Sequence, residues 1–173
     1  MKKYLLVSLA VALALSLVFG SAMAAGKDGQ AGKSNTGHLY FYEKDPSDWT
    51  IVDRGAWGKM KYNLRGSELC VVFNGHGLET GMDYTLIYYP DPWPGNDLIC
   101  LGTGTANEFG DVHIKNCTDT GSLPTEDDEN YPDGAKIWLV LSDDADCGNQ
   151  MVDWNPTEYL FENALITFDD TDV

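Results

Sequence analysis

The sequence predicts an all-β protein with an antiparallel β-sandwich fold, immunoglobulin-like or jelly-roll-like, of about eight or nine strands. Short runs rich in β-branched and aromatic residues recur between turns of Gly, Pro, Asn or Asp. Residues 82–89 are apolar on both faces of their pleat, which predicts a strand buried in the middle of the fold. One short helix is expected near residues 156–162, because Asn155, Pro156 and Glu158 form a helix-start pattern.

The expected strands are short apolar runs bounded by turn-forming residues. In order, they lie at residues 38–42, 49–52, 57–64, 68–73, 82–89, 98–103, 111–115, 135–141 and 164–168. Side chains alternate between polar and apolar in several of these runs, which predicts one solvated and one packed face. The expected core includes Leu39, Phe41, Met60, Val71, Phe73, Tyr84, Leu86, Val112, Ile114, Trp138 and Val140.

The first residues have the pattern of a secretory signal peptide. Lys2 and Lys3 precede an apolar run over residues 4–19, and residues 22–24 (Ala-Met-Ala) form a small-residue cleavage site. The following stretch has no large apolar residue and is expected to be flexible. The chain is therefore expected to divide into a signal peptide, a flexible leader and a single β-sandwich domain, at residues 1–24, 25–37 and 38–173. This predicts a secreted or cell-surface protein without membrane insertion after signal cleavage.

Four cysteines, an even number in an exported chain, predict two disulfides. No pair has the two-residue spacing of zinc-binding cysteines. Four cysteines allow three pairings. We expect Cys100 to pair with Cys117, because they lie on opposite limbs of an expected hairpin, and this leaves Cys70 with Cys147.

The net charge of −16 makes nucleic acid an improbable partner, because such a surface repels phosphates. No cofactor is predicted, although two acidic loops offer the carboxylate and carbonyl oxygens that calcium binds. The candidate ligands are Asp127, Asp128, Asp133, Asp143, Asp144 and Asp146, with Asn130 beside them. Neither loop has the spacing of an EF-hand, and solvated acidic loops are the alternative interpretation.

A candidate binding surface lies where the most apolar run ends. Three prolines stop this strand and hold Trp93 on a stiff loop. Tyr88, Tyr89 and Trp93 beside Asp91 resemble the aromatic and acidic surfaces with which carbohydrate-binding modules stack sugar rings. The sequence does not identify the partner, and a glycan or a surface protein is the candidate. The alternative is an aromatic corner that covers the edge of the fold.

The sequence contains no G-x-S-x-G elbow, no H-E-x-x-H motif and no phosphate-binding glycine loop. His38, His76 and His113 lie on three different segments, and their spacing predicts no shared metal site. We expect a non-catalytic module with a binding or structural role. A calcium- or carbohydrate-binding domain is one alternative, and a secreted hydrolase that uses surface carboxylates is another, because such carboxylate pairs are defined in space rather than in sequence.

Three stretches, HLYFYEKDPSDW, GHGLETGMDYTLIYY and AKIWLVLSDDADC, together resemble uncharacterised secreted archaeal proteins of methanogen type. The likeness covers residues 38–168 and implies a β-sandwich, but no activity. A second pattern is similar to the strand-turn-strand units of many extracellular immunoglobulin-like domains, and it implies a scaffold rather than a ligand. It is formed by Gly77, Leu78, Gly81, Tyr84 and Leu86.

Overall fold

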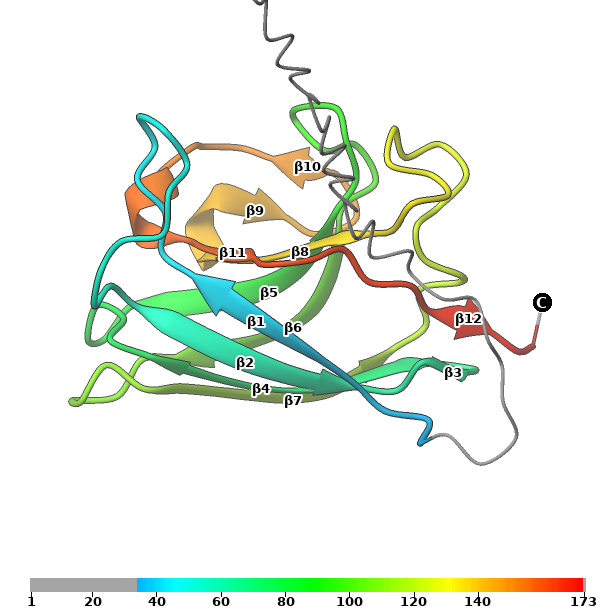
Figure 1. Cartoon of the computed structure of the whole chain (residues 1–173), viewed down its shortest axis with the longest axis horizontal. Helices are drawn as coiled ribbons and strands as arrows, with labels where there is room; N and C mark the ends of the chain where they lie inside the picture. Colours follow the sequence, from blue (N-terminus) through cyan, green and yellow to red (C-terminus); the bar gives the residue numbers. More distant parts are fainter. Residues whose placement is uncertain (1–33, 173) are drawn as a thin grey trace, which may run out of the picture. The chain divides into compact units, whose positions relative to one another are not determined.

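The structure is a computed structural model that describes residues 34–172, which form an all-β domain (Figure 1). Its elements are β1 (Gly37–Tyr42), β2 (Trp57–Tyr62), β3 (Arg65–Gly66), β4 (Leu69–His76), β5 (Asp83–Tyr89), β6 (Ile99–Thr105), β7 (Val112–Thr118), β8 (Lys136–Leu141), η1 (Ser142–Asp144), β9 (Ala145–Asp146), β10 (Gln150–Met151), η2 (Pro156–Glu158), β11 (Leu160–Glu162) and β12 (Asp169–Asp170). The predicted signal peptide and residues 25–33 of the predicted leader lie outside the described residues.

Eight strands form one antiparallel sheet in the order β6-β5-β8-β11-β1-β2-β4-β7. The sheet curves until its two edge strands, β6 and β7, lie side by side (Figure 1). The Asn116 side-chain amide donates a hydrogen bond of 3.1 Å to the carbonyl of Leu101 across this seam. The all-β, antiparallel prediction is confirmed, but a single, nearly closed sheet replaces the predicted two-sheet sandwich.

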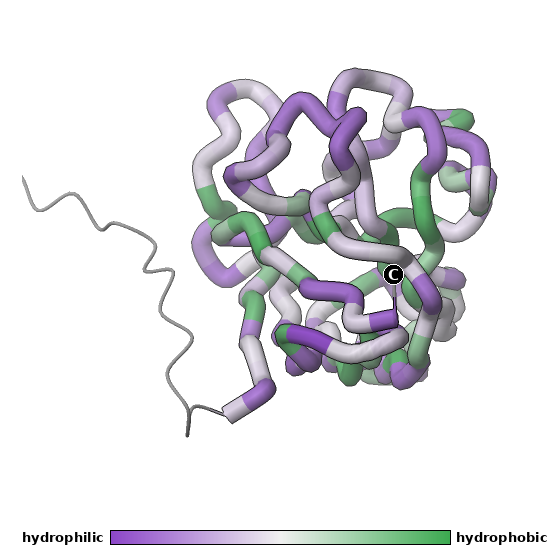
Figure 2. Tube along the Cα trace, turned by 90° about the vertical axis from the view of Figure 1, so that its right-hand side faces the viewer, coloured by the Kyte–Doolittle hydropathy of each residue, from purple (hydrophilic) through white to green (hydrophobic). Residues whose placement is uncertain are grey.

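The interior of the curved sheet holds the main core. Every residue predicted for the core is buried, including Phe41, Met60 and Leu86 with no exposed surface. Buried and solvent-accessible residues alternate along β1, β2 and β4, and hydrophilic and hydrophobic stretches are interspersed along the chain (Figure 2). Nine of the eleven predicted core residues lie in this inner core, where alternation along the strands identified the inward face. Trp138 and Val140 instead belong to a second, outer cluster, because β8 is apolar on both faces and its sequence does not alternate.

A second apolar cluster covers the outer face of β5, β8 and β11. Its buried members are Ile87, Tyr89, Leu98, Trp138, Val140, Met151, Tyr159 and Phe161. The segment over residues 142–159 supplies two of them, so this segment lies against the sheet. β5 is consequently buried on both faces, as its apolar sequence predicts.

The domain contains two disulfides, as predicted, but the predicted pairing of the cysteines is wrong. Cys70 bonds to Cys117, and Cys100 bonds to Cys147. Cys70 and Cys117 face each other in the ladder between β4 and β7. β6 and β7 do not form the expected paired hairpin, because β6 pairs with β5 and β7 pairs with β4. Two disulfides are typical of proteins from oxidising compartments.

The prediction of a helix near residues 156–162 is wrong. The structure has a single 3-10 turn, Pro156–Glu158, and Asn155 makes no side-chain cap. Leu160–Glu162 form β11 instead, because Leu160 packs into the inner core and Phe161 into the outer cluster. No helix within residues 34–172 is long and apolar enough to cross a membrane.

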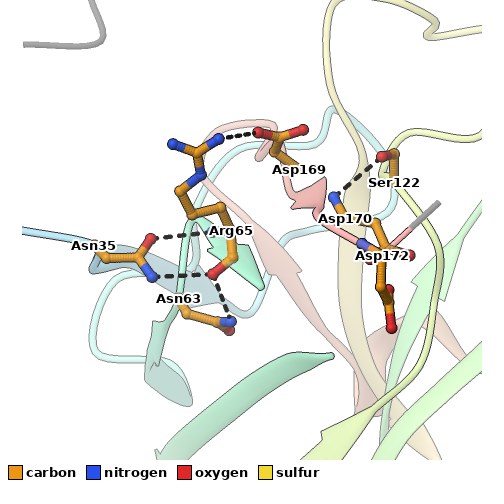
Figure 3. Close-up of polar contacts among 7 residues, drawn as sticks. All are labelled: Asn35, Asn63, Arg65, Ser122, Asp169, Asp170 and Asp172. Carbon is orange, nitrogen blue, oxygen red and sulfur yellow. Dashed lines mark hydrogen bonds and ion pairs between the residues drawn. The ribbon is translucent and has the colours of Figure 1, made fainter. Parts of the chain in front are cut away.

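Arg65 joins the two ends of the described chain (Figure 3). Its backbone exchanges two hydrogen bonds with the Asn35 side chain, at 2.9 and 3.1 Å. Its guanidinium forms a 2.9 Å ion pair with Asp169 of β12, which pairs in parallel with β3. Asn35, expected in the flexible leader, is therefore held against the domain.

Candidate functional site

A groove of about 460 Å³, which we call the aromatic groove, lies beside β8 and β11. Its volume is in the range of small-molecule sites. It is lined by Lys44, Trp49, Tyr89, Asp91, Trp93, Lys136, Trp138, Trp154, Phe161 and Glu162. Three of the four residues predicted for binding, Tyr89, Asp91 and Trp93, thus meet here.

The floor of the aromatic groove is a rigid set of buried rings. Trp138 stacks on Tyr89, with ring centroids 3.9 Å apart and planes at 11°. Phe161 meets Trp138 edge to face at 5.3 Å. Trp138 and Phe161 are direct cross-strand partners on β8 and β11, so the sheet determines their spacing.

Three tryptophans from three separate loops form the walls. Trp49, Trp93 and Trp154 are 50%, 52% and 37% exposed, unlike the floor residues. Trp93 contacts Trp154 edge-on at 5.3 Å, and Trp49 contacts Phe161 in the same manner at 5.2 Å. Their exposed indole faces are therefore held in place by other aromatic rings.

Trp49 has a left-handed backbone conformation, with a φ of 61°. This region is unfavourable for a bulky residue by roughly 1–3 kcal/mol. A 2.7 Å hydrogen bond from the Trp49 amide to the carbonyl of Asp45 closes its turn, and a bridge between Lys44 and Ile51 closes the loop base. The backbone of Trp49 is therefore strained, and this conformation places its exposed indole at the groove.

Two carboxyl groups and two lysines supply the polar part of the lining. Asp91 forms an ion pair with Lys136 and accepts a 2.5 Å hydrogen bond from the Asn130 amide. Lys44 donates to the backbone carbonyl of Glu162 at 3.1 Å, and its ammonium lies 5.9 Å from the centroid of Phe161.

Glu162 has an unusual environment. Within residues 34–172, its Oε2 is the only buried side-chain nitrogen or oxygen without a hydrogen-bond partner. Burial raises the pKa of Glu162 to about 7, although its own backbone amide, Lys44 and Lys136 act in the opposite direction. The groove therefore contains a carboxyl group that changes charge near neutral pH.

Tyr88, the fourth residue predicted for binding, does not line the groove. Neighbouring side chains of a strand point to opposite faces, so Tyr88 enters the inner core while Tyr89 joins the outer cluster. Its hydroxyl donates a 2.7 Å hydrogen bond to Asp128, and burial raises the pKa of Tyr88 to about 12. Tyr88 is thus a structural residue.

The six aspartates predicted to bind calcium do not form a cluster. Asp127, Asp133, Asp143 and Asp146 are exposed. Asp128 and Asp144 are buried and accept hydrogen bonds from protein groups, with Tyr159 donating to Asp144 at 2.5 Å. In the described part of the chain, the one group with metal-ligand geometry is Glu68, Cys70 and Cys117, and its cysteines form a disulfide.

Sequence reasoning did not find Trp49, Trp138, Trp154 and Glu162, because they lie far from Trp93 in the chain. One pattern does mark the walls. Each wall tryptophan lies in a polar loop close to an aspartate and a proline, in the stretches PSDWT, DPWPG and VDWNP. An exposed loop is an unfavourable place for a large apolar ring unless the ring has a function.

No protein-family model, curated protein or solved structure matches the chain. The role of the aromatic groove therefore depends on its own geometry and chemistry.

Proposed function

We propose that this protein is a secreted or cell-surface, non-catalytic module that binds sugar rings of a glycan in the aromatic groove. The observation that carries the proposal is the set of three exposed tryptophans above a buried aromatic floor. The predicted signal peptide and the two disulfides support an extracellular location.

Sugar rings match this lining chemically. Their C–H faces are apolar and stack on indole rings, while their hydroxyls both donate and accept hydrogen bonds. The groove offers Lys44 and Lys136 as donors, and Asp91 as an acceptor through Oδ1, since its contacts with Lys136 and Asn130 are both made by Oδ2. Because other rings already hold the indoles, little conformational entropy is lost when a ligand binds.

Glycoside hydrolysis is a second candidate function, and one observation favours it. Asp91 and Glu162 line the same groove, and burial raises the pKa of Glu162 to about 7, as in a general acid. Binding without catalysis has more support. The Oε2 atom of Glu162 is shielded from solvent, and Asp91 is already engaged by Lys136 and Asn130.

Titration calorimetry with neutral oligosaccharides of glucose, mannose, xylose and N-acetylglucosamine tests the proposal. We expect at least one series to bind, and Trp154→Ala to weaken that binding about tenfold or more, equivalent to about 1.4 kcal/mol. Phe109→Ala is the control, since Phe109 is 76% exposed and lies outside the groove. Absence of binding in all four series, or equal binding by Trp154→Ala, would contradict glycan binding.

The same sugars separate binding from hydrolysis. A non-catalytic module leaves the oligosaccharides intact during prolonged incubation, as measured by chromatography of the products. Release of shorter sugars by the wild type, abolished in both Glu162→Gln and Asp91→Asn, would establish the hydrolase instead.

A further inference from the structure

The outer face of β1, β2, β4 and β7 is basic, although the protein is strongly acidic. The chain has 27 Asp and Glu residues and a net charge of −16. The outward-facing positions of these four strands, all within the described residues, carry no Asp or Glu. Their charged and titratable side chains are Lys59, Lys61, Lys115, His38, His76 and His113. We call this surface the basic face.

Strand register aligns the cations across the basic face. His38 lies opposite Lys61, Lys61 opposite Val72, and Val72 opposite Lys115. Two strand spacings separate the backbones of Lys61 and Lys115, which is roughly 10 Å. A hollow of about 380 Å³ lies between them and is also lined by Asn116. This row therefore places one lysine on each side of the hollow.

The lysines of the basic face are free to meet a ligand. Within residues 34–172, the ion pairs involve other cations, and none includes Lys59, Lys61 or Lys115. Two acidic groups border the face, and one of them, Glu68, lies within 4.8 Å of the sulfur atoms of Cys70 and Cys117, which line the hollow. The other, Asp111, contacts His76 at 2.7 Å.

Aromatic rings are interspersed among the cations. The ammonium of Lys59 lies 5.2 Å from the ring centroid of Tyr40, and the Trp57 ring packs against His76 at 4.8 Å. Tyr40 is 38% exposed and Trp57 is 42% exposed. Exposed rings suit the apolar faces of a polymer, and the neighbouring ammonium groups suit its negative charges.

We propose that the basic face is a second binding site, separate from the aromatic groove, for a carboxylate-bearing polysaccharide. Such a polymer presents an apolar ring face and a negative charge in each acidic residue. The lysine ammonium groups supply point charges for the carboxylates, and Tyr40 and Trp57 supply exposed rings for the sugar faces. Arg54 and Arg65 lie outside the four strands of the face, and Arg65 is paired with Asp169. The leader does not complement the face, since residues 25–33 contain two lysines and one aspartate.

Binding of oligogalacturonate to the full domain, measured by calorimetry at low and high salt, tests this site. We expect binding at about 20 mM salt and a loss of at least about tenfold at about 500 mM, because screening weakens exposed charge pairs. Fully methyl-esterified oligogalacturonate is the matched neutral ligand and should bind at least about tenfold more weakly.

Variants locate the site. Lys61→Gln with Lys115→Gln should reduce affinity for oligogalacturonate at least about tenfold at an unchanged melting temperature, whereas Arg54→Gln should retain it. Trp154→Ala should also retain it, so failure of the groove proposal leaves this result intact. Absence of binding at low salt, equal binding of the methyl ester, or undiminished binding by the double variant would overturn the proposal. Tighter binding of oligo(dT) than of oligogalacturonate would assign the face to single-stranded nucleic acid instead.

Discussion

Replacing Glu162 by Gln should remove a pH dependence of stability that originates in the floor of the aromatic groove. Burial raises the pKa of Glu162 from its usual 4.5 to about 7, so the folded state binds this proton more tightly than the unfolded state. The stabilisation from the bound proton is complete below about pH 4.5 and is lost as the pH rises through 7. The difference between the two pKa values corresponds to about 3 kcal/mol.

Urea unfolding of both proteins between pH 5 and pH 8 measures this quantity. The free energy of unfolding of Glu162→Gln, relative to wild type, should increase with pH by up to about 3 kcal/mol, because the amide never has to bury a charge. Any constant offset from the new amide donor cancels in this comparison. Glu126→Gln, at an exposed position outside the groove, is the reference for the loss of one carboxyl group. A difference for Glu162→Gln that does not change with pH would mean that its carboxyl is solvated and would refute the reasoning.

Three further results are expected. Trp93→Ala should weaken glycan binding by about 2 kcal/mol or more with little change in melting temperature, because the indole is 52% exposed. Acrylamide quenching of tryptophan fluorescence measures that exposure, and a shielded Trp93 indole would contradict the prediction. Leu86→Ala should lower the free energy of unfolding in urea by roughly 2–5 kcal/mol, since Leu86 has no exposed surface; a smaller loss would place it outside the packed core. Replacing Cys100 and Cys147 by Ser should cost about 4 kcal/mol in the chain-entropy model for a separation of 47 residues, and peptide mapping of the oxidised wild type should recover this pair rather than Cys100 with Cys117.

The candidate site was only partly predictable from the chain. Tyr89, Asp91 and Trp93 are close together in sequence, so one local pattern identified them. Trp49 and Trp154 reach the same groove from distant loops. The choice between Tyr88 and Tyr89 was also not local, because β5 is buried on both faces and its polarity does not distinguish them.

The sequence by itself determined the all-β class, most strands and the predicted core, because alternation of apolar residues and turn chemistry act over a few neighbouring residues. Only the tertiary structure decided which strands pair. β6 and β7 are consecutive in the chain and look like a hairpin, yet each pairs with a different strand, and they meet only as the edges of the curved sheet. The disulfide pairing follows that register, since Cys70 and Cys117 face each other across β4 and β7. Strand pairing depends on contacts between residues far apart in sequence, and no local pattern records them.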